Sequence, residues 1–305
     1  MAAPTSSSIA VPFGVATLGI ALFSIMDAVM KHLVLEIGTY NALVWRTGTV
    51  ALMSGALFVA LRGGLPGRAA MRIHLRRGLI GAVMAILFFW GLGRVPLAQA
   101  IALAFIAPLI SLYLAAILLK ERIERRAIAA SALGLAGVVV IFVGQGEADL
   151  GREALYGSVA VLLSACLYAY NIILMRQQAL VAGPVEVAFF ISAITTCAYL
   201  LGAPFLAVLP PLQHWPFILF GAALAFGSLL LLAWAYARAQ AQHLAPVEYT
   251  SFIWAAALGW WVFGERVSWF TLAGAALIVV ACLIAATRRE PDHVAQAEAG
   301  IAGGA

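Results

Sequence analysis

The segment AVMAILFFWGLGRVPLAQAIALAFIAPLISLYLAAILLKER, residues 82–122, is apolar along nearly its whole length and holds four residues of types that are scarce in this chain. These four are Trp90, Arg94, Glu121 and Arg122. They recur in residues 226–266, each 144 positions later, as Trp234, Arg238, Glu265 and Arg266. Apolar matches between membrane helices arise easily by chance, whereas four scarce residues at one offset predict an internal repeat.

Working outward from this segment, ten stretches are long and apolar enough to cross a bilayer as helices. We predict spans at about residues 12–31, 40–61, 77–94, 96–119, 127–145, 155–176, 186–209, 216–238, 245–264 and 267–287. The runs are continuously apolar rather than alternating, which favours helices over barrel strands. The predicted class is therefore an all-α polytopic membrane protein with two five-helix repeats, residues 12–145 and 155–287. The polar tail, residues 288–305, is expected to be disordered and cytoplasmic.

Composition supports lipid as the solvent, because 64% of the 305 residues are hydrophobic, only 10% are charged and the mean hydropathy is +1.03. The net charge of +5 does not indicate nucleic-acid binding, since the cations gather in particular loops. With the N-terminus inside, the cytoplasmic side holds thirteen cations, against four on the far side, which predicts a bacterial inner-membrane protein with both termini in the cytoplasm. The thirteen are Arg62, Arg68, Arg72, Arg76, Arg77, Lys120, Arg122, Arg125, Arg126, Arg176, Arg238, Arg288 and Arg289.

Five crossings per half put the second half upside down relative to the first, an arrangement typical of secondary transporters with a solute site between the halves. It also brings each repeated arginine to the same side as the other half's glutamate. We therefore hypothesise two alternating gates, Arg94 with Glu265 and Arg238 with Glu121. The alternative is that these charges only end their helices and face water and headgroups, with Glu121 paired to Arg125 one turn away.

The chain resembles the EamA-type members of the drug/metabolite transporter superfamily over about residues 13 to 287. The resemblance rests on five-plus-five spans and on the Glu-Arg pair that closes the fourth helix of each half, LLKER at 118–122 and FGER at 263–266. Two segments, MDAVMKHL at 26–33 and APVEYTSFIWAAALGWWVFGE at 245–265, are similar to the branch of bacterial riboflavin and S-adenosylmethionine uptake proteins. The resemblance implies a ten-helix carrier without a cofactor, whose central cavity is lined by helices 1, 3, 4, 6, 8 and 9.

Ionisable residues inside a span are costly and mark candidate sites. Asp27 could receive a cationic group or a coupling proton, or could pair with Lys31 one turn later. Arg46 could hold an anionic solute, or serve as the structural counter-ion of Asp27. Glu248 follows Pro246 and could be a gate or proton acceptor, or a first-turn acid that complements the helix dipole.

Aromatic residues form a second candidate set. A planar ring or cation could stack within a box of Trp90, Trp234, Tyr168, Tyr170, Tyr249 and Trp254. Packing and interfacial belts are the ordinary explanation for any single one, and apply first to Trp215, Trp260, Trp261 and Trp269. Asn171, at 144 positions from Asp27, could line the cavity opposite it, and Pro108 could kink the fourth span.

The predicted function is secondary transport of a small organic metabolite, ring-bearing or zwitterionic, by alternating access, with proton coupling as a hypothesis. The expected partners are this solute and membrane lipid, in a monomer or homodimer. Neither Lys31 nor Lys120 follows a phosphate-binding glycine loop, which argues against an ATP-driven pump. The histidines have no metal-ligand spacing, and no serine or cysteine indicates an enzyme nucleophile. The alternatives are an exporter of amino acids, amines or drugs, a membrane-embedded lipid enzyme, and a non-transporting scaffold.

Overall fold

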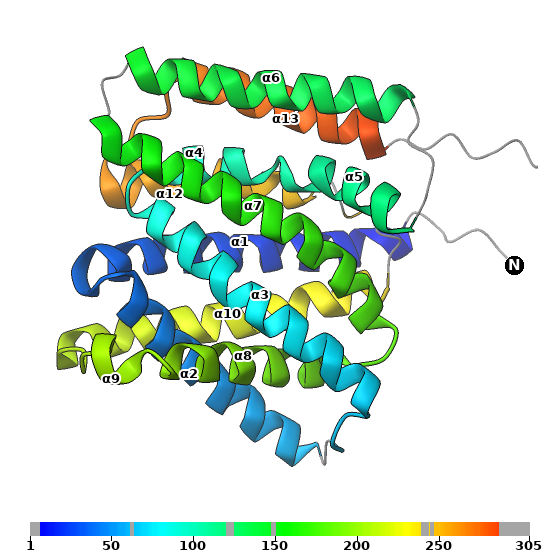
Figure 1. The fold of residues 1–305 in the computed structure, drawn as a ribbon, viewed down its shortest axis with the longest axis vertical. Coiled ribbons are helices and arrows are strands. Elements are labelled where there is room, and N and C mark those ends of the chain that lie inside the picture. The colour runs from blue at the N-terminus through cyan, green and yellow to red at the C-terminus, as the bar shows by residue number, and fades with distance from the viewer. Residues whose placement is uncertain are drawn as a thin grey trace, which may run out of the picture.

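The computed structural model describes residues 7–61, 64–119, 125–147, 151–238, 244 and 247–286, and within these residues all regular structure is helical (Figure 1). The elements are α1 (Ser7–Ile37), α2 (Thr39–Ala60), α3 (Arg68–Leu92), α4 (Leu97–Ala104), α5 (Ala107–Leu119), α6 (Arg125–Glu147), α7 (Gly151–Ala179), α8 (Pro184–Leu200), α9 (Ala203–Leu206), the 3-10 turn η1 (Leu212–His214), α10 (Trp215–Tyr236), α12 (Thr250–Phe263) and α13 (Trp269–Ala286). The predicted all-α class is confirmed. The predicted tail lies outside the described residues.

Six helical stretches in the described chain are long and apolar enough to cross a membrane, and four shorter apolar helices accompany them. They lie side by side in a bundle (Figure 1). The first residues of α1 and the last of α13 lie at the same end of this bundle, which we call the near end. The opposite end, where α1 and α3 finish, is called the far end.

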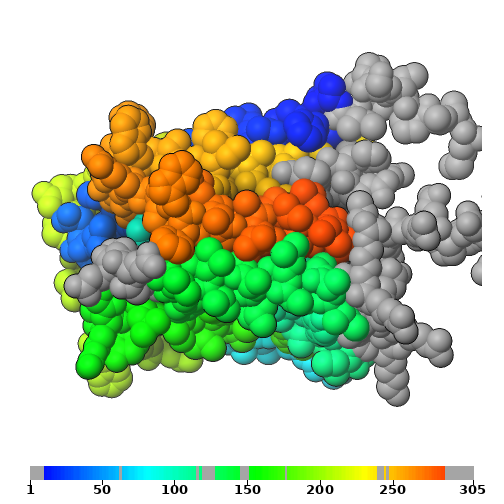
Figure 2. Space-filling model, turned by 90° about the horizontal axis from the view of Figure 1, so that it is seen from above, coloured from blue at the N-terminus to red at the C-terminus, as the bar shows by residue number. Residues whose placement is uncertain are grey.

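Helix pairing follows a two-fold pattern between the halves. Elements 144 residues apart are counterparts, so α7 corresponds to α1 and α10 corresponds to α3. Helix α1 of the first half packs on α10 of the second, and α7 packs on α3 in the same way. Two pairs join counterparts directly, α2 with α8 and α6 with α13. Two others match each other across the halves: α3 packs on α8 as α10 packs on α2, and α5 packs on α7 as α12 packs on α1. Figure 2 shows α13, in orange to red, lying along α6, in green, on one face of the molecule. Each half therefore completes its packing against the other half.

Glycines allow several of these pairs to approach closely, as is common for small residues between membrane helices. A Cβ on Gly137 of α6 would lie 2.6 Å from the carbonyl oxygen of Gly274 in α13, and the converse distance is also 2.6 Å. A Cβ on Gly78 of α3 would lie 2.7 Å from the Ile194 side chain of α8. Gly81 has open space where its Cβ would be and faces the pocket described below.

Two helix boundaries differ from the prediction. The third span was predicted to begin at residue 77, but α3 begins at Arg68, because Arg72 and Arg76 stay on its exposed face while the apolar face continues. The fourth span is divided into α4 and α5 just before Pro108, which lacks the N–H that the preceding turn needs. The break leaves the Phe105 carbonyl outside the helix ladder, and the Cys282 thiol donates to it at 3.3 Å. The kink predicted at Pro108 is confirmed.

Candidate functional site

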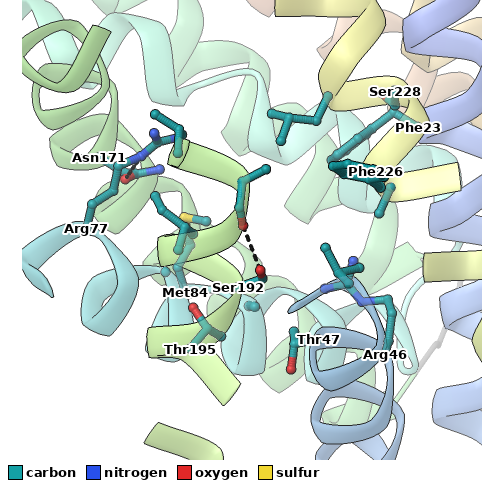
Figure 3. Close-up of a pocket in the computed structure, with 18 of the residues that line it drawn as sticks. Phe23, Arg46, Thr47, Arg77, Met84, Asn171, Ser192, Thr195, Phe226 and Ser228 are labelled. Carbon is teal, nitrogen blue, oxygen red and sulfur yellow. Dashed lines mark hydrogen bonds between the residues drawn. The ribbon is translucent and has the colours of Figure 1, made fainter. Parts of the chain in front are cut away.

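A pocket of about 300 Å³ lies between the two halves of the bundle. Its walls come from α1, α2 and α3 of the first half and from α7, α8 and α10 of the second. Figure 3 shows Arg77 and Asn171 together on one side, with Arg46 and Thr47 on another. The lining residues are Phe23, Arg46, Thr47, Val50, Arg77, Gly81, Met84, Ala85, Asn171, Val187, Ala188, Ile191, Ser192, Thr195, Ala225, Phe226, Ser228, Leu229 and Leu232.

Arg46 enters this pocket from the second turn of α2 and has only weak partners. Its Nη1 contacts the Met26 sulfur at 3.5 Å, and its guanidinium lies 5.4 Å from the centre of the Phe89 ring. Its Nε is buried and has no hydrogen-bond partner among the described residues. An unpaired buried donor of a charged group costs about 1–3 kcal/mol or more. The arginine is therefore held in place with donor capacity to spare.

Arg77 is held much more firmly, by a chain of polar side chains that runs toward the near end. Its Nε donates to Asn171 Oδ1 at 3.2 Å, and its Nη1 donates to Gln178 Oε1. The amide nitrogen of Gln178 contacts His74 Nδ1 at 2.5 Å, and His74 Nε2 contacts Glu186 at 3.0 Å. His74 and Gln178 are fully buried, so the chain links the pocket wall to the more exposed Glu186 at the start of α8.

The pocket hydroxyls are already used by the backbone. Thr47 donates to the Leu43 carbonyl at 2.8 Å and Ser192 to the Ala188 carbonyl at 2.6 Å, each within its own helix. Thr195 donates to Gly78 at 3.1 Å and Ser228 to Gly19 at 2.8 Å, each across to another helix. Because their protons are committed, these groups face the pocket as acceptors.

At the far end, Glu265 makes a contact between the halves, with a cation that the sequence did not predict for it. Lys31 of α1 donates to the Glu265 carboxylate and, at 2.7 Å, to the Val95 carbonyl. The Leu97 N–H at the start of α4 donates to the other carboxylate oxygen at 2.7 Å. We call this set, Lys31, Val95, Leu97 and Glu265, the far-end latch.

The latch corrects two expected pairings. Lys31 binds Glu265 rather than Asp27, because the end of α1 faces the turn between α12 and α13. Arg94 binds Glu153 of α7 at 2.9 Å rather than Glu265, because the end of α3 meets the start of α7. The second predicted gate cannot be placed, since Glu121 lies outside the described residues.

The repeated Trp and Arg residues form the same local structure in both halves. Arg94 stacks on Trp90 at 3.6 Å and donates to the Trp90 carbonyl at 3.0 Å. Arg238 stacks on Trp234 at 4.1 Å and donates to the Trp234 carbonyl at 3.2 Å. In each case the tryptophan lies two residues before its helix ends, so the arginine satisfies a carbonyl of the last turn. Neither tryptophan lines the pocket.

Three of the other predicted site residues gather near the near end, outside the pocket. The hydroxyl of Tyr236 donates to Glu248 at 2.5 Å. Tyr168 lies near both Glu248 and Arg77, and Tyr249 lies against Phe105 with ring centres 5.3 Å apart. Trp254 is 38% exposed and does not line the pocket. Among the predicted residues, Arg46 and Asn171 are therefore the two that the pocket wall contains.

Asp27 is buried close to Arg46 but does not bind it. Its Oδ1 and the Arg46 Nε both lack a hydrogen-bond partner in the described part of the chain. A closed ion pair between the two would have satisfied both atoms. Their interaction is therefore through space, and the predicted counter-ion role of Arg46 is not a contact in this conformation.

Sequence reasoning missed Arg77, the hydroxyls and the two phenylalanines of the pocket. Arg77 was counted among the cytoplasmic cations, because the third span was predicted to begin at this residue. The spacing of Ala70, His74, Gly78 and Ala82, four residues apart, would have extended the helix, since it marks one buried face. The second and seventh spans line the pocket with the first, third, sixth and eighth, whereas the resemblance implied the fourth and ninth in their place.

Both halves of the chain match the EamA-like transporter family, over residues 13–143 and 155–287, and the chain belongs to this family. The pseudopaline exporter CntI of Pseudomonas aeruginosa is 26% identical over 272 residues, which cover 86% of this chain and 90% of that protein. The riboflavin transporter of Rhizobium johnstonii is 28% identical over 276 residues and 87% of each chain. The S-adenosylmethionine uptake transporter of Rickettsia bellii is 28% identical over 218 residues, 69% of this chain and 71% of that one.

A crystal structure of another protein superposes on 91% of this chain and 97% of its own with a TM-score of 0.60 at 22% sequence identity, which shows a shared fold. The predicted resemblance to EamA-type transporters is confirmed by the family and by these relatives. The chain is thus a multi-pass membrane transporter, and its family and relatives are transporters rather than enzymes.

Proposed function

We propose that this member of the EamA-like transporter family is a secondary transporter that moves a small organic metabolite across the bacterial inner membrane by alternating access. The pocket between the halves is the solute site. The observation that carries the proposal is that three helices from each half surround one pocket of metabolite size. Sites at the interface of two repeats are reached from either side when one repeat rocks against the other.

The far-end latch is the second support for this mechanism. It joins α1 and the start of α4 to the turn after α12, so it ties the first half to the second at the far end. Opening the far end requires these contacts to separate. In this proposal the structure represents a state closed at the far end, and the chain crosses the membrane ten times with both termini in the cytoplasm.

The named relatives suggest two directions of transport, uptake and export, each with its own candidate solutes. Riboflavin-like and S-adenosylmethionine-like metabolites taken up by the cell are one group, supported by the similarity to the two named uptake proteins. Export is the alternative, supported by the exporter CntI, whose match covers 86% of this chain. Export of amino acids, amines or drugs falls under the same alternative.

The test begins with a thermal-shift screen of the purified protein against metabolites. Every compound that stabilises the protein is then tested for flux in proteoliposomes, with protein-free liposomes as the control and with and without a pH gradient. Saturable flux of a stabilising compound supports the proposal. If no compound stabilises the protein or crosses the bilayer, the proposal fails.

Direction is tested in cells that lack other routes for the compound. Net accumulation of labelled solute indicates uptake, whereas protection from a toxic intracellular concentration indicates export. Reporter fusions at each terminus check the topology, since green fluorescent protein fluoresces and alkaline phosphatase stays inactive when fused to a cytoplasmic end.

A further inference from the structure

We infer that the solute of the pocket is an organic anion, received at the Arg46 guanidinium and attracted by Arg77 on another wall. The inference rests on the proposed transport function and names the chemical class of its solute. It is carried by the donors and charges that line the pocket.

The charge around the pocket is one-sided. Arg46 and Arg77 are cations, and the described residues that line the pocket include no aspartate or glutamate. The acids nearby are placed otherwise. Glu186 binds His74, Glu248 binds Tyr236, and Asp27 lies outside the lining without a contact to Arg46. In a medium of low dielectric constant, cations without an anionic contact partner attract anions strongly.

Arg46 is the group with a place for a ligand. Its described partners are a thioether sulfur and a ring face, neither of which is a strong acceptor, and its Nε has none. A guanidinium presents five N–H donors in a fork that fits the two oxygens of a carboxylate or phosphate. An anionic oxygen would therefore supply the acceptor that this side chain lacks.

Arg77 contributes positive charge without a neutralising partner. The groups that hold it, Asn171 and Gln178, are neutral amides that accept hydrogen bonds through their oxygens. This fixes the guanidinium against the wall, beside Asn171, which also lines the pocket. The pocket hydroxyls cannot replace these donors, since each already donates to a backbone carbonyl.

The rest of the lining indicates that the anion carries an organic body. Phe23 and Phe226 lie together on the side away from Arg77, and Met84 adds a thioether surface (Figure 3). Most of the surface that the pocket offers is therefore apolar, and a small inorganic anion would leave it unfilled. A carboxylate and a phosphate ester share the chemistry that the arginines select.

The experiment compares probes that differ only in charge, with the full-length protein purified in detergent. Three skeletons are used: 3-phenylpropionate, its amide and 3-phenylpropylamine; indole-3-acetate, its amide and tryptamine; hexanoate, its amide and hexylamine. Phenyl phosphate tests the phosphate source. Binding is measured by calorimetry. The anion of at least one skeleton is expected to bind at least about tenfold more tightly than its amide and its amine.

Variants assign the preference to the arginines. Arg46→Gln and Arg77→Gln are each expected to weaken anion binding about tenfold or more. Amide binding should fall less, and amine binding should not fall, because the amine loses a repelling cation. Arg46→Lys and Arg77→Lys keep the charge and are expected to retain part of the preference. Arg76→Gln is the matched control, because Arg76 is the neighbour of Arg77 but lies on the exposed face of α3. Gel filtration confirms that each variant is folded and monodisperse.

The outcomes separate this inference from the proposed function. Amides or amines that bind as tightly as the anions, or a preference that survives both glutamine variants, overturn the inference while transport stands. If no probe binds, the inference is tested by the charge of the metabolite that the protein transports in proteoliposomes. An anionic metabolite supports the inference, and a neutral or cationic metabolite overturns it. Tighter binding of phenyl phosphate than of the carboxylates supports an organic phosphate as the anion. Absence of all binding and all flux removes the proposed function as well.

Discussion

The far-end latch depends on two side chains, Lys31 and Glu265, that come from different halves and are largely buried. Lys31 also donates to Val95, and Glu265 accepts from Leu97, so each charge has a second partner. A buried charge that loses its partner costs about 3–5 kcal/mol, whereas removing both charges together is often nearly neutral.

This arrangement predicts a strong coupling in a double-mutant cycle. Lys31→Met and Glu265→Leu should each lower the thermal stability in detergent, and the double variant should be more stable than the sum of the single effects predicts, by about 1–3 kcal/mol. Arg94→Gln with Glu153→Gln is the control cycle, since that pair is exposed and should couple by less than about 1 kcal/mol. Additive losses at Lys31 and Glu265 would contradict the latch.

Glu248 is the acid for which a coupling role is testable. It accepts from Tyr236 near the near end and interacts electrostatically with Tyr168. If it carries the coupling proton, Glu248→Gln removes the titrating group but keeps the shape, so flux in proteoliposomes should lose its response to a pH gradient. Asp27→Asn is tested in parallel. Flux that ignores the gradient, together with normal flux in both variants, would eliminate proton coupling through these residues.

At this scale the sequence was informative about which residues were unusual and less so about their partners. Arg46 and Asn171 were singled out and do line the pocket. A pair of Lys31 with Asp27 was one of two alternatives, because one helical turn separates them, but contacts between distant helices decide the partner of a buried cation. Trp90 and Trp234 were placed in a binding box because aromatic type alone cannot distinguish a ligand surface from a stack on the arginine four residues later.

Among the elements, α6 and α13 form the pair in which two glycines bring the backbones together. A side chain at Gly137 would meet both the carbonyl oxygen of Gly274 and the Ile278 side chain, at 2.6 and 2.8 Å. Gly137→Val should therefore force the helices apart and lower the unfolding free energy by about 1–3 kcal/mol or more. Gly14→Val is the control, because nothing lies within 4 Å of its Cβ position. Equal thermal unfolding temperatures for the two variants would refute this contact.

The helices themselves were largely predictable, since long apolar runs in a membrane chain have few alternatives to a helix. Breaks and ends were harder. Pro108 marked the break between α4 and α5, because proline lacks a donor wherever it occurs. The early start of α3 was missed, because Arg72 and Arg76 read as a loop when hydropathy is averaged over both faces of a helix.

For the whole molecule, the latch and the pocket together predict that locking the far end stops transport. Lys31→Cys and Glu265→Cys are placed in a background where Cys166, Cys197 and Cys282 are serine, and are joined by a short, cleavable, bifunctional thiol reagent. Flux should fall to the level of protein-free liposomes and recover when a reductant cleaves the bridge. Each single-cysteine variant, treated identically, is the control. Undiminished flux after complete cross-linking would exclude alternating access through this end.

The internal repeat was the feature of the whole molecule that the sequence predicted best. An offset of 144 residues linked the halves, and the Trp–Arg stack recurs in both at that offset. The pocket could not be predicted from it, because α2 and α8 meet at the centre of the two-fold pattern and their lining residues, Thr47 and Ser192, are common polar types without a repeat.

Lys31 is buried and has both of its hydrogen-bond partners, Val95 and Glu265, only when three segments of the chain meet. Separating these segments in a carrier without solute would leave the charge of Lys31 unpaired. In the proposed mechanism the closed latch would block the far end of the empty protein, which would then not dissipate the membrane's electrochemical gradient. In this mechanism the binding of solute would supply the energy needed to separate Lys31 from Glu265. The far end would then open when solute is bound and stay closed when the site is empty.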